Sequence, residues 1–432
     1  MTDLSPFKVA VLIGFGLMLF GGFIALTLFS GAGGGETVTI NLWGTAPQSI
    51  VREAIKQSVP DDTTVRVEYI EKEADTFDTE LLEALAAGEG PDLFFLPQDK
   101  ILKHQGKLWT IPFESYEERR FQDTFASVTE VYLTSQGSIG LPIIVDPMVM
   151  YWNRTLFDQH RISAPPQTWD SFNNEPLRSF IDRDGQQIDQ AMIAFGNFSN
   201  ITNAKDILTT LVMQSGSPLV ERQGLDTYRA VMGISQEGQV ISSAVAAVNF
   251  YTQFADPNKV VYTWNNSLPD SKQMFLNGDL AVYVGFASER NDLMRENPNL
   301  DFGVAMLPQS SGRDQQLTGA RLEALAIPSQ SQKKGVALTA AALLTEGEGA
   351  RIIAEWSGLP PARRDLLSET QSRSHMDVFH DSAFISRSWF DPEPESSTEV
   401  FREMIQSIQS GRLQPAEAIG RANRELQNLL DQ

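Results

Sequence analysis

Aromatic and charged side chains stand where two predicted strands end. Trp43 closes an alternating apolar segment, and Asp99 and Lys100 follow a continuous apolar run. Ligands of parallel sheets bind beyond the carboxyl ends of the strands. An indole offers a flat face for stacking, whereas a carboxylate and an ammonium group bond polar ligand atoms. These positions are therefore candidates for a binding site, with two alternatives open: Trp43 faces the core, or Asp99 and Lys100 form a solvated loop pair.

Catalytic and metal-binding patterns are missing from the sequence. The chain has no cysteine, which excludes thiolate nucleophiles, cysteine-ligated zinc and iron–sulfur clusters. It has only four histidines, so a histidine-rich metal centre is not expected. His375 and His380 are five residues apart and do not share the helix face of a zinc protease motif. The segment 182–185 superficially resembles a calcium loop, but a two-residue hairpin turn at Asp184 and Gly185 explains it better. We expect no enzyme activity, no metal and no cofactor.

The length of the chain and its net charge bear on the number of lobes and on the class of partner. The chain has 432 residues and a net charge of −21, from 34 basic and 55 acidic residues. This length exceeds one ordinary domain and predicts two lobes. Binding of nucleic acid needs a basic surface, so the excess of acids argues against a nucleic-acid partner.

The N-terminus carries a segment typical of a membrane anchor. Residues 9–29 are uncharged and mostly apolar, and a helix of this length spans roughly 31 Å, enough to cross the bilayer. We expect a single-pass transmembrane helix at 9–29 and a glycine-rich tether at 30–35. Lys8 on the cytoplasmic side would leave the remainder of the chain outside the cell membrane. Cleavage as a signal peptide near Ser30 is the alternative.

The part that follows has an α/β pattern. Residues 37–43 and 65–69 alternate as strands, and residues 93–96 form an apolar run suited to a strand covered on both faces. Apolar residues at helical spacing occupy 51–59 and 77–85, the second helix ending at Gly88. This order predicts a parallel sheet.

Motifs in the middle of the chain carry a resemblance to a known family. They are Gly90–Leu93, Leu141–Asp146, Val149–Asn153, Leu156–Phe157, Pro165–Trp169, Phe275–Ala281, Phe302–Pro308, Glu323–Pro328 and Gly358–Arg363. In this order they resemble bacterial extracellular solute-binding proteins of the sugar-binding family 1, such as the maltose- and oligosaccharide-binding proteins of ABC importers. The resemblance covers about residues 36–432.

The resemblance implies an α/β fold of two hinge-linked lobes that close on a ligand in the cleft between them. The first lobe is then 36–142 and 309–358, and the second is 146–302 and 365–432. The implied function is capture of a sugar or oligosaccharide by a monomer and its delivery to an ABC permease in the membrane. Polyamines, phosphorylated compounds and a role as a sensor for a membrane kinase stay open, and an enzyme acting on glycans lacks any catalytic group.

The resemblance also points to ligand residues. Sugar-binding relatives place an acid followed by a base at the position of Asp99 and Lys100, and an acidic ligand residue at the hinge position of Asp146. A helix N-cap or turn role beside Pro147 is the alternative for Asp146. Relatives often carry an aromatic platform where this chain has Phe286 and Ser288.

Three further candidates come from their surroundings. Trp264 lies in a polar loop and Trp389 in an irregular stretch, and both are predicted to stack on a ligand. Arg321 follows Gly319 and Ala320 and would bond hydroxyls or an anionic group, or form a salt bridge to Glu323 or another neighbour. Trp109, Trp152, Trp169 and Trp356 are predicted to pack in the core.

Overall fold

The computed structural model describes residues 37–224, 227–234, 241–312, 315–369 and 374–432. The predicted transmembrane helix at 9–29 and the tether at 30–35 lie outside these residues. Within the described part, no helix is both long enough and apolar enough to cross a membrane.

The elements up to the middle of the long strand β6 build the first part of the fold. In order they are β1 (Val38–Gly44), α2 (Gln48–Ser58), β2 (Val65–Glu71), α3 (Phe77–Ala87), β3 (Leu93–Pro97), η1 (Gln98–Lys100), α4 (Ile101–His104), β4 (Ile111–Pro112), α5 (Glu118–Thr124), η2 (Ser127–Tyr132), β5 (Gly137–Ser138) and β6 (Leu141–Asn153).

The following elements lead to the second long strand, β13. They are α6 (Arg154–Gln159), η3 (Trp169–Asn173), α7 (Glu175–Arg178), β7 (Asp182–Asp184), β8 (Gln187–Ile193), α8 (Ala204–Gln214), β9 (Val220–Arg222), β10 (Tyr228–Ala230), α9 (Ser242–Thr252), η4 (Gln253–Ala255), α10 (Ser271–Asn277), β11 (Leu280–Phe286), α11 (Glu289–Glu296), β12 (Phe302–Ala305) and β13 (Thr318–Ala326).

The chain ends in a mostly helical part. Its elements are α12 (Lys334–Glu346), α13 (Glu348–Ser357), α14 (Arg364–Leu367), α15 (Ser374–Phe384), β14 (Ser386–Arg387), α16 (Pro394–Gln409) and α17 (Pro415–Leu430).

The predicted alternation of strands and helices at the start of the described chain is confirmed. Strand β1 pairs in parallel with β2 and with β3, as the order strand, helix, strand, helix, strand predicts. Gly88 ends α3 in the left-handed conformation with φ 76°, which glycine adopts without strain. The predicted hairpin is present, with β7 antiparallel to β8, but its two turn residues are Gly185 and Gln186, because Asp184 ends β7 and pairs with Gln187.

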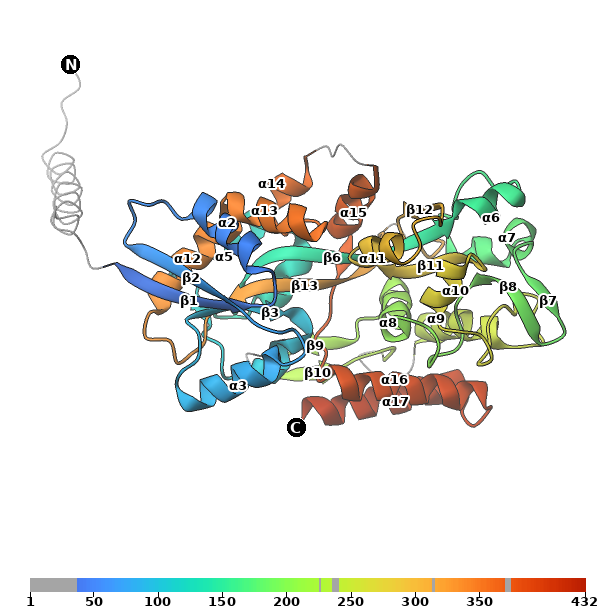
Figure 1. Cartoon of the computed structure of the whole chain (residues 1–432). Helices are drawn as coiled ribbons and strands as arrows, with labels where there is room; N and C mark the ends of the chain where they lie inside the picture. Colours follow the sequence, from blue (N-terminus) through green and yellow to red (C-terminus); the bar gives the residue numbers. More distant parts are fainter. Residues whose placement is uncertain (1–36, 225–226, 235–240, 313–314, 370–373) are drawn as a thin grey trace, which may run out of the picture.

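Two long strands join the two halves of the molecule (Figure 1). The strand order of the large sheet is β2-β1-β3-β13-β6-β11-β8-β7. β6 is 13 residues long, and its first half pairs with β13 whereas its second half pairs with β11 and β12. The change of partner falls beside Asp146 and Pro147, so the chain crosses between the halves there.

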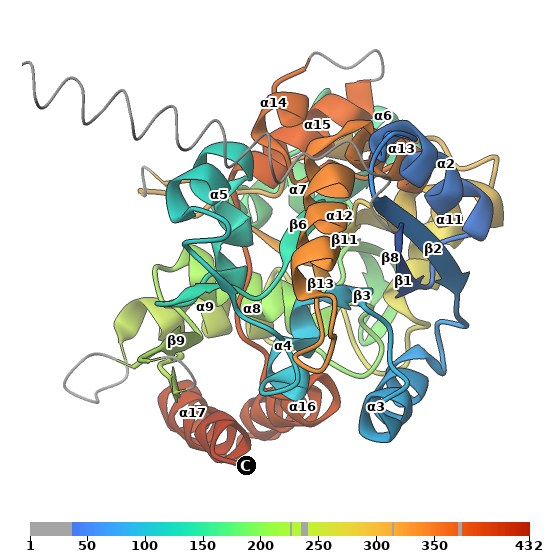
Figure 2. The same ribbon diagram turned by 90° about the vertical axis from the view of Figure 1, so that its left-hand side faces the viewer.

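Each half has its own hydrophobic core, so the protein has two lobes. The first core contains Ile40, Leu81 and Phe94, with the buried part of α12 and α13 packed beside them. The second core contains Phe157, Phe195 and Tyr251, together with buried residues of α16 and α17. We call the halves built on these cores the first and the second lobe. In the view turned by 90° (Figure 2), α16 and α17 lie together at the bottom, away from α12 and α13.

Lobe boundaries at single-residue precision remain a prediction. Leu366, Leu367 and Ala383 pack in the first core, although the predicted second lobe includes residues 365–432. The C-terminal part therefore contributes to both cores before α16 and α17 complete the second lobe.

Candidate functional site

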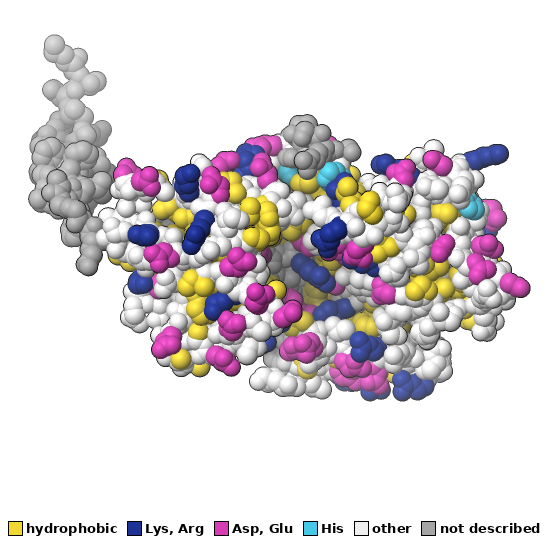
Figure 3. Space-filling model, viewed as in Figure 1, with side chains coloured by type: hydrophobic (Ala, Val, Ile, Leu, Met, Phe, Trp, Pro, Cys, Tyr) yellow, Lys and Arg dark blue, Asp and Glu magenta, His cyan; other side chains and the backbone are white. Residues whose placement is uncertain are grey.

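A pocket of about 610 Å³ lies between the lobes, where the long strands cross. Its wall combines η1 beyond β3, the first turns of α8, the last residue of β11, the start of β13, the segment 387–395 and α16. The surface view shows a hollow in the middle of the molecule with Lys and Arg side chains inside it (Figure 3). Four of the predicted site residues line this pocket: Asp99, Phe286, Arg321 and Trp389.

Asp99 stands directly beyond the carboxyl end of β3, in η1. Its carboxylate makes no hydrogen bond or ion pair with the described residues, so it is available to a ligand donor. Lys100, the next residue, is not part of the pocket wall. The structure therefore brings only the acid of the predicted pair to the pocket.

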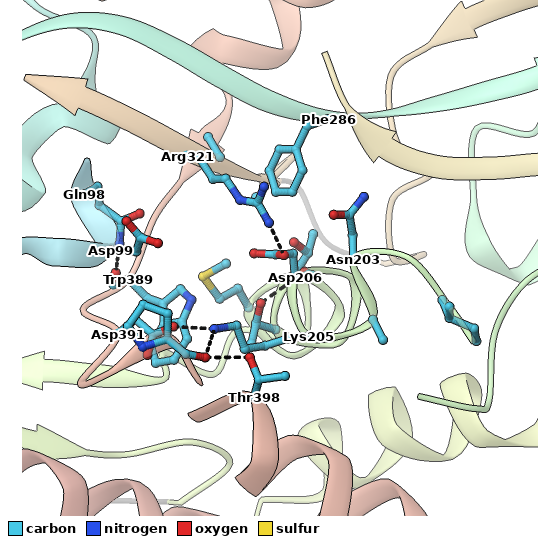
Figure 4. A pocket seen from close by; sticks show the side chains of 18 of the residues that line it. Gln98, Asp99, Asn203, Lys205, Asp206, Phe286, Arg321, Trp389, Asp391 and Thr398 are labelled. Carbon is cyan, nitrogen blue, oxygen red and sulfur yellow. Dashed lines mark hydrogen bonds and ion pairs between the residues drawn. The ribbon is translucent and has the colours of Figure 1, made fainter. Parts of the chain in front are cut away.

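Arg321 connects the two lobes across the pocket. It projects from β13, and its Nη2 donates to Asp206 Oδ2 of α8 over 2.7 Å. Its guanidinium carbon lies 3.9 Å from the centre of the Phe286 ring, a cation–π contact (Figure 4). Of the two alternatives for Arg321, the ion pair to a neighbour is present, with Asp206 and not with Glu323. The side chain also lines the pocket, and its bond to a ligand stays a prediction.

Asp146 and Ser288 contact each other beside the pocket. Asp146 is the cross-strand partner of Arg321, and its Oδ1 accepts a hydrogen bond from Ser288 N over 3.0 Å. Burial raises the pKa of Asp146 to about 6, although the Ser288 hydrogen bond and the charge of Arg321 oppose this rise. Neither residue is part of the pocket wall. Asp146 and Pro147 lie within strand β6, so the alternative of an N-cap or turn beside Pro147 is not present, and the Asp146 carboxylate instead bonds the backbone before α11. Its contact with a ligand stays a prediction.

Trp389 forms another part of the wall. Its half-buried indole meets Phe401 edge-on, with ring centres 6.2 Å apart. Gln98 donates a hydrogen bond from its side-chain amide to the backbone carbonyl of Trp389. Asp391, two residues further, pairs with Lys205 of α8 over 2.6 Å.

The predicted ligand contacts of two tryptophans need correction. Trp264 is 0% exposed within the second core, and its Nε1 donates to Asn200 Oδ1 over 3.2 Å, so no face is open for the predicted stacking. Trp43 packs against the first core with the Lys72 ammonium 4.0 Å from its ring centre, and it does not line the pocket. Of its two alternatives, the structure has the core-facing one.

The tryptophans expected in the core behave differently from one another. Trp169 is buried, and its Nε1 donates to Gln214 Oε1 over 2.6 Å. Trp109 and Trp152 are partly buried and pack against the cores. Trp356 is 44% exposed, so its predicted packing is wrong.

Sequence reasoning missed the contribution of α8. Asn203, Lys205 and Asp206 all line the pocket from the start of this helix. Asn203 has a left-handed backbone with φ 60°, and its Nδ2 donates to Glu289 Oε1 over 2.6 Å. A polar cluster before an apolar helix was the only available signal, and it resembles an ordinary helix start.

The charges of the pocket wall balance. Four acidic side chains (Asp99, Asp206, Asp391 and Glu395) and four basic ones (Lys205, Arg321, Arg387 and Arg402) line it. Across the described ranges, no group of three or more His, Asp or Glu side chains is arranged to hold a metal ion. The site is therefore suited to a polar ligand held by hydrogen bonds and aromatic contacts.

Comparison with known proteins assigns the family. A family model described as bacterial extracellular solute-binding protein matches residues 53–377, more than half of the chain. The chain belongs to this family of solute-binding proteins. A binding protein of Brucella abortus is 22% identical over 320 residues, which cover 70% of this chain and 69% of the relative. A binding protein of Brucella suis matches to the same extent.

Solved structures of solute-binding proteins share the fold. A cyclo/maltodextrin-binding protein in complex with maltotetraose superimposes with a TM-score of 0.73 at 17% identity, covering 92% of this chain and 98% of the other. The maltose-binding periplasmic protein of Listeria monocytogenes, in complex with maltose, gives 0.69 at 15% identity, with 90% and 97% covered. UgpB from Mycobacterium tuberculosis, in complex with glycerophosphocholine, gives 0.68 at 17% identity, with 92% and 99% covered.

Proposed function

We propose that this solute-binding protein captures a sugar or oligosaccharide in the pocket between its lobes and delivers it to an ABC permease. The hinge motion typical of such two-lobed proteins would close the pocket around the ligand. Several solved structures with this fold carry saccharides, among them maltotetraose, maltose and maltotriose. They support the proposal at the level of the fold.

For this chain, the main support for a saccharide ligand is the set of side chains in the pocket wall. Trp389 offers aromatic surface for the C–H face of a sugar ring. Phe286 is 2% exposed and holds the Arg321 guanidinium 3.9 Å from its ring centre, so it supports Arg321 and leaves the stacking to Trp389. Asp99 has a free carboxylate, and Arg321 presents a planar guanidinium beside Asp206. Aromatic surface together with planar charged groups that bond paired hydroxyls is the chemistry of a saccharide site.

The charge balance of the wall argues against a polyamine. The chain as a whole carries −21, but the acids and bases at the pocket are equal in number, and Asp206 and Asp391 are already paired with cations. Among the described residues, Asp99 and Glu395 are the wall carboxylates without an ion pair, and the unpaired Arg387 in the same wall would repel a polycation.

A zwitterionic phosphodiester is the second candidate. Arg387 lines the pocket, and its Nη1 donates to Ser127 Oγ over 3.4 Å and to its neighbour's carbonyl over 2.8 Å. No carboxylate pairs with it among the residues that the structure describes. A phosphate group would find a cation there, while Asp99 would face a cationic head group.

A thermal-shift screen distinguishes these ligands. We expect a saccharide from a panel of mono- and oligosaccharides to raise the melting temperature, and the rise to be lost in Trp389→Ala and in Asp99→Asn. The same panel includes spermidine and glycerophosphocholine. Stabilisation by glycerophosphocholine alone would select the second candidate, and stabilisation by spermidine alone would contradict both.

The location and the partners are further parts of the proposal. We place the folded part outside the cell membrane, tethered by the predicted apolar helix at residues 9–29. Because the chain has no cysteine, a lipid cannot be attached to one, and this segment would serve as the anchor instead. We expect a monomer with lobes at 36–142 with 309–358 and at 146–302 with 365–432, except that Leu366, Leu367 and Ala383 of the last range pack in the first core. Co-purification from cross-linked membranes tests the partner: recovery of a permease supports import, and recovery of a kinase supports a sensor.

A further inference from the structure

The segment that carries Trp389 lies between the two lobes. Trp389 packs against the core of the second lobe, whereas the next residue, Phe390, packs against the core of the first. Neither a helix nor a strand holds residues 388–393. The position of the indole in the pocket therefore depends on side-chain contacts from both sides.

Lys205 ties this segment to the second lobe. Its Nζ donates to Asp391 Oδ2 over 2.6 Å, to the carbonyl of Pro394 over 3.1 Å and to Ser397 Oγ over 3.1 Å. An ammonium group has three donors, so none is left for a ligand. The side chains of Lys205 and Asp391 are only 13% and 4% exposed. Lys205 therefore lines the pocket without a free bonding group.

Gln98 holds the same segment from the first lobe. The side chain follows β3 directly, is 5% exposed, and donates its amide to the backbone carbonyl of Trp389. This single neutral hydrogen bond is weaker than the buried, charge-assisted contacts of Lys205. When the lobes separate, the Gln98 bond is the one expected to break.

We propose that Lys205 and Gln98 are positioning residues that place Trp389 in the wall of the pocket from opposite lobes. Lys205 contacts Asp391 beside Trp389 (Figure 4), and through this contact it keeps the indole with α8 and α16 in both the open and the closed protein. Gln98 completes its placement when the lobes come together. The effect on ligand affinity rests on the proposed function, but the placement of the indole does not.

Fluorine NMR of the purified full chain tests the placement without any ligand. With 5-fluorotryptophan in place of tryptophan, the signals of Trp389 and Trp264 are assigned from Trp389→Phe and Trp264→Phe. We expect Lys205→Met to displace or broaden the Trp389 signal and to leave the buried Trp264 signal unchanged. Asp391→Asn keeps an oxygen that accepts from Lys205, so it should preserve the Trp389 signal. Lys272→Met is the matched control, because it removes an ion pair with Glu296 that lies away from the pocket.

An unchanged Trp389 signal in folded Lys205→Met would overturn the proposal. Should this variant fail to fold because Asp391 is left unpaired, Lys205→Met combined with Asp391→Leu removes both buried charges. The double variant should fold and still show a displaced Trp389 signal, and an undisplaced one contradicts the proposal.

Ligand binding gives the second readout. With the saccharide that stabilises the wild-type protein, Lys205→Met should bind about tenfold more weakly, equivalent to about 1.4 kcal/mol, and the control Lys272→Met, outside the pocket, as well as wild type. Equal affinities for Lys205→Met and wild type would contradict the positioning role. If no saccharide binds the wild-type protein, the proposed function fails, while the fluorine signals still decide the placement.

Discussion

Trp264 and Trp389 show how burial separates two side chains of the same type. Trp264 has no exposed surface, and its single polar atom is bonded to Asn200. Trp389 keeps part of its ring open in the pocket wall. The first is therefore a packing residue and the second a ligand-contact candidate.

Alanine at these two positions should separate the roles. Trp264→Ala is expected to lower the free energy of unfolding by about 3–5 kcal/mol, the range for large core residues, with little change in affinity for the folded protein. Trp389→Ala should lower saccharide affinity by about tenfold or more, equivalent to at least about 1.4 kcal/mol. Urea unfolding and titration calorimetry measure the two effects. A loss of affinity without a loss of stability in Trp264→Ala would contradict the assignment.

Glu323 is a carboxyl with an unusual environment next to the pocket. It lies on β13 two residues after Arg321, opposite Pro97 and Ile144 of the neighbouring strands. Burial raises its pKa to about 7. Because the folded protein then holds the proton more tightly than the unfolded chain does, this carboxyl lowers stability as pH rises from about 4 towards 7.

Glu323→Gln should therefore stabilise the protein at high pH. We expect a larger free energy of unfolding than wild type at pH 8, a smaller gain at pH 6, and almost none at pH 4, where the wild-type carboxyl is protonated in the folded state. Urea unfolding at these three pH values measures the difference. A variant that is less stable than wild type at pH 8 would show that the carboxylate has a stabilising partner.

At the scale of elements, the contact between α8 and β13 brings the pocket together. A methyl group at Gly319 on β13 would lie 2.3 Å from Thr210 Oγ1 on α8, which is closer than atoms can pack. Thr210 is buried, and its hydroxyl contacts Met148 Sδ at 3.8 Å. Glycine at 319 thus allows the helix that carries Lys205 and Asp206 to approach the strand that carries Arg321.

Gly319→Ala is expected to separate these two elements. Overpacking should cost about 1–3 kcal/mol of stability and weaken ligand binding, because Asp206 moves away from Arg321. Adding Thr210→Ala frees the space and should recover most of the loss. Urea unfolding of the four chains of this double-mutant cycle measures the coupling. Additive effects of the two substitutions would contradict a direct clash.

At the scale of the whole molecule, the charge is distributed unevenly. The chain carries −21, whereas the pocket wall has equal numbers of acids and bases. The surplus acids therefore lie away from the pocket, where those on the surface keep the protein well solvated. Net charge thus describes the surface of this protein and not its ligand.

The proposed anchor makes a prediction for the entire chain. In membrane fractionation, the full chain should sediment with the membranes, and a chain that lacks residues 1–35 should not. Both should show the same melting temperature and the same response to the stabilising saccharide, because the anchor does not contribute to the pocket. If the full-length chain is expressed but is recovered in the non-membrane fraction in a form that lacks its N-terminal residues, cleavage as a signal peptide is favoured instead.

Local patterns in the sequence determined much of the fold. Alternating and continuous apolar runs predicted β1, β2 and β3, and Gly88 marked the end of α3, because backbone geometry links side-chain direction to spacing along the chain. The order of motifs placed the chain in its family and the crossing near Asp146. Asp99, at the end of a strand, was found by the same local rule.

Only the tertiary structure decided which of the candidate side chains meet. Asp206 and Arg321 are 115 residues apart in the chain, and Lys205 and Asp391 are 186 apart. Spacing along a strand or a helix shows which residues share a face, but not which distant element covers that face. For this reason the polar neighbours of Trp264 in the sequence suggested an open loop, whereas the fold buries its side chain. The contribution of α8 to the pocket wall follows from the packing of the two lobes around β6 and β13, which spacing along the chain does not show.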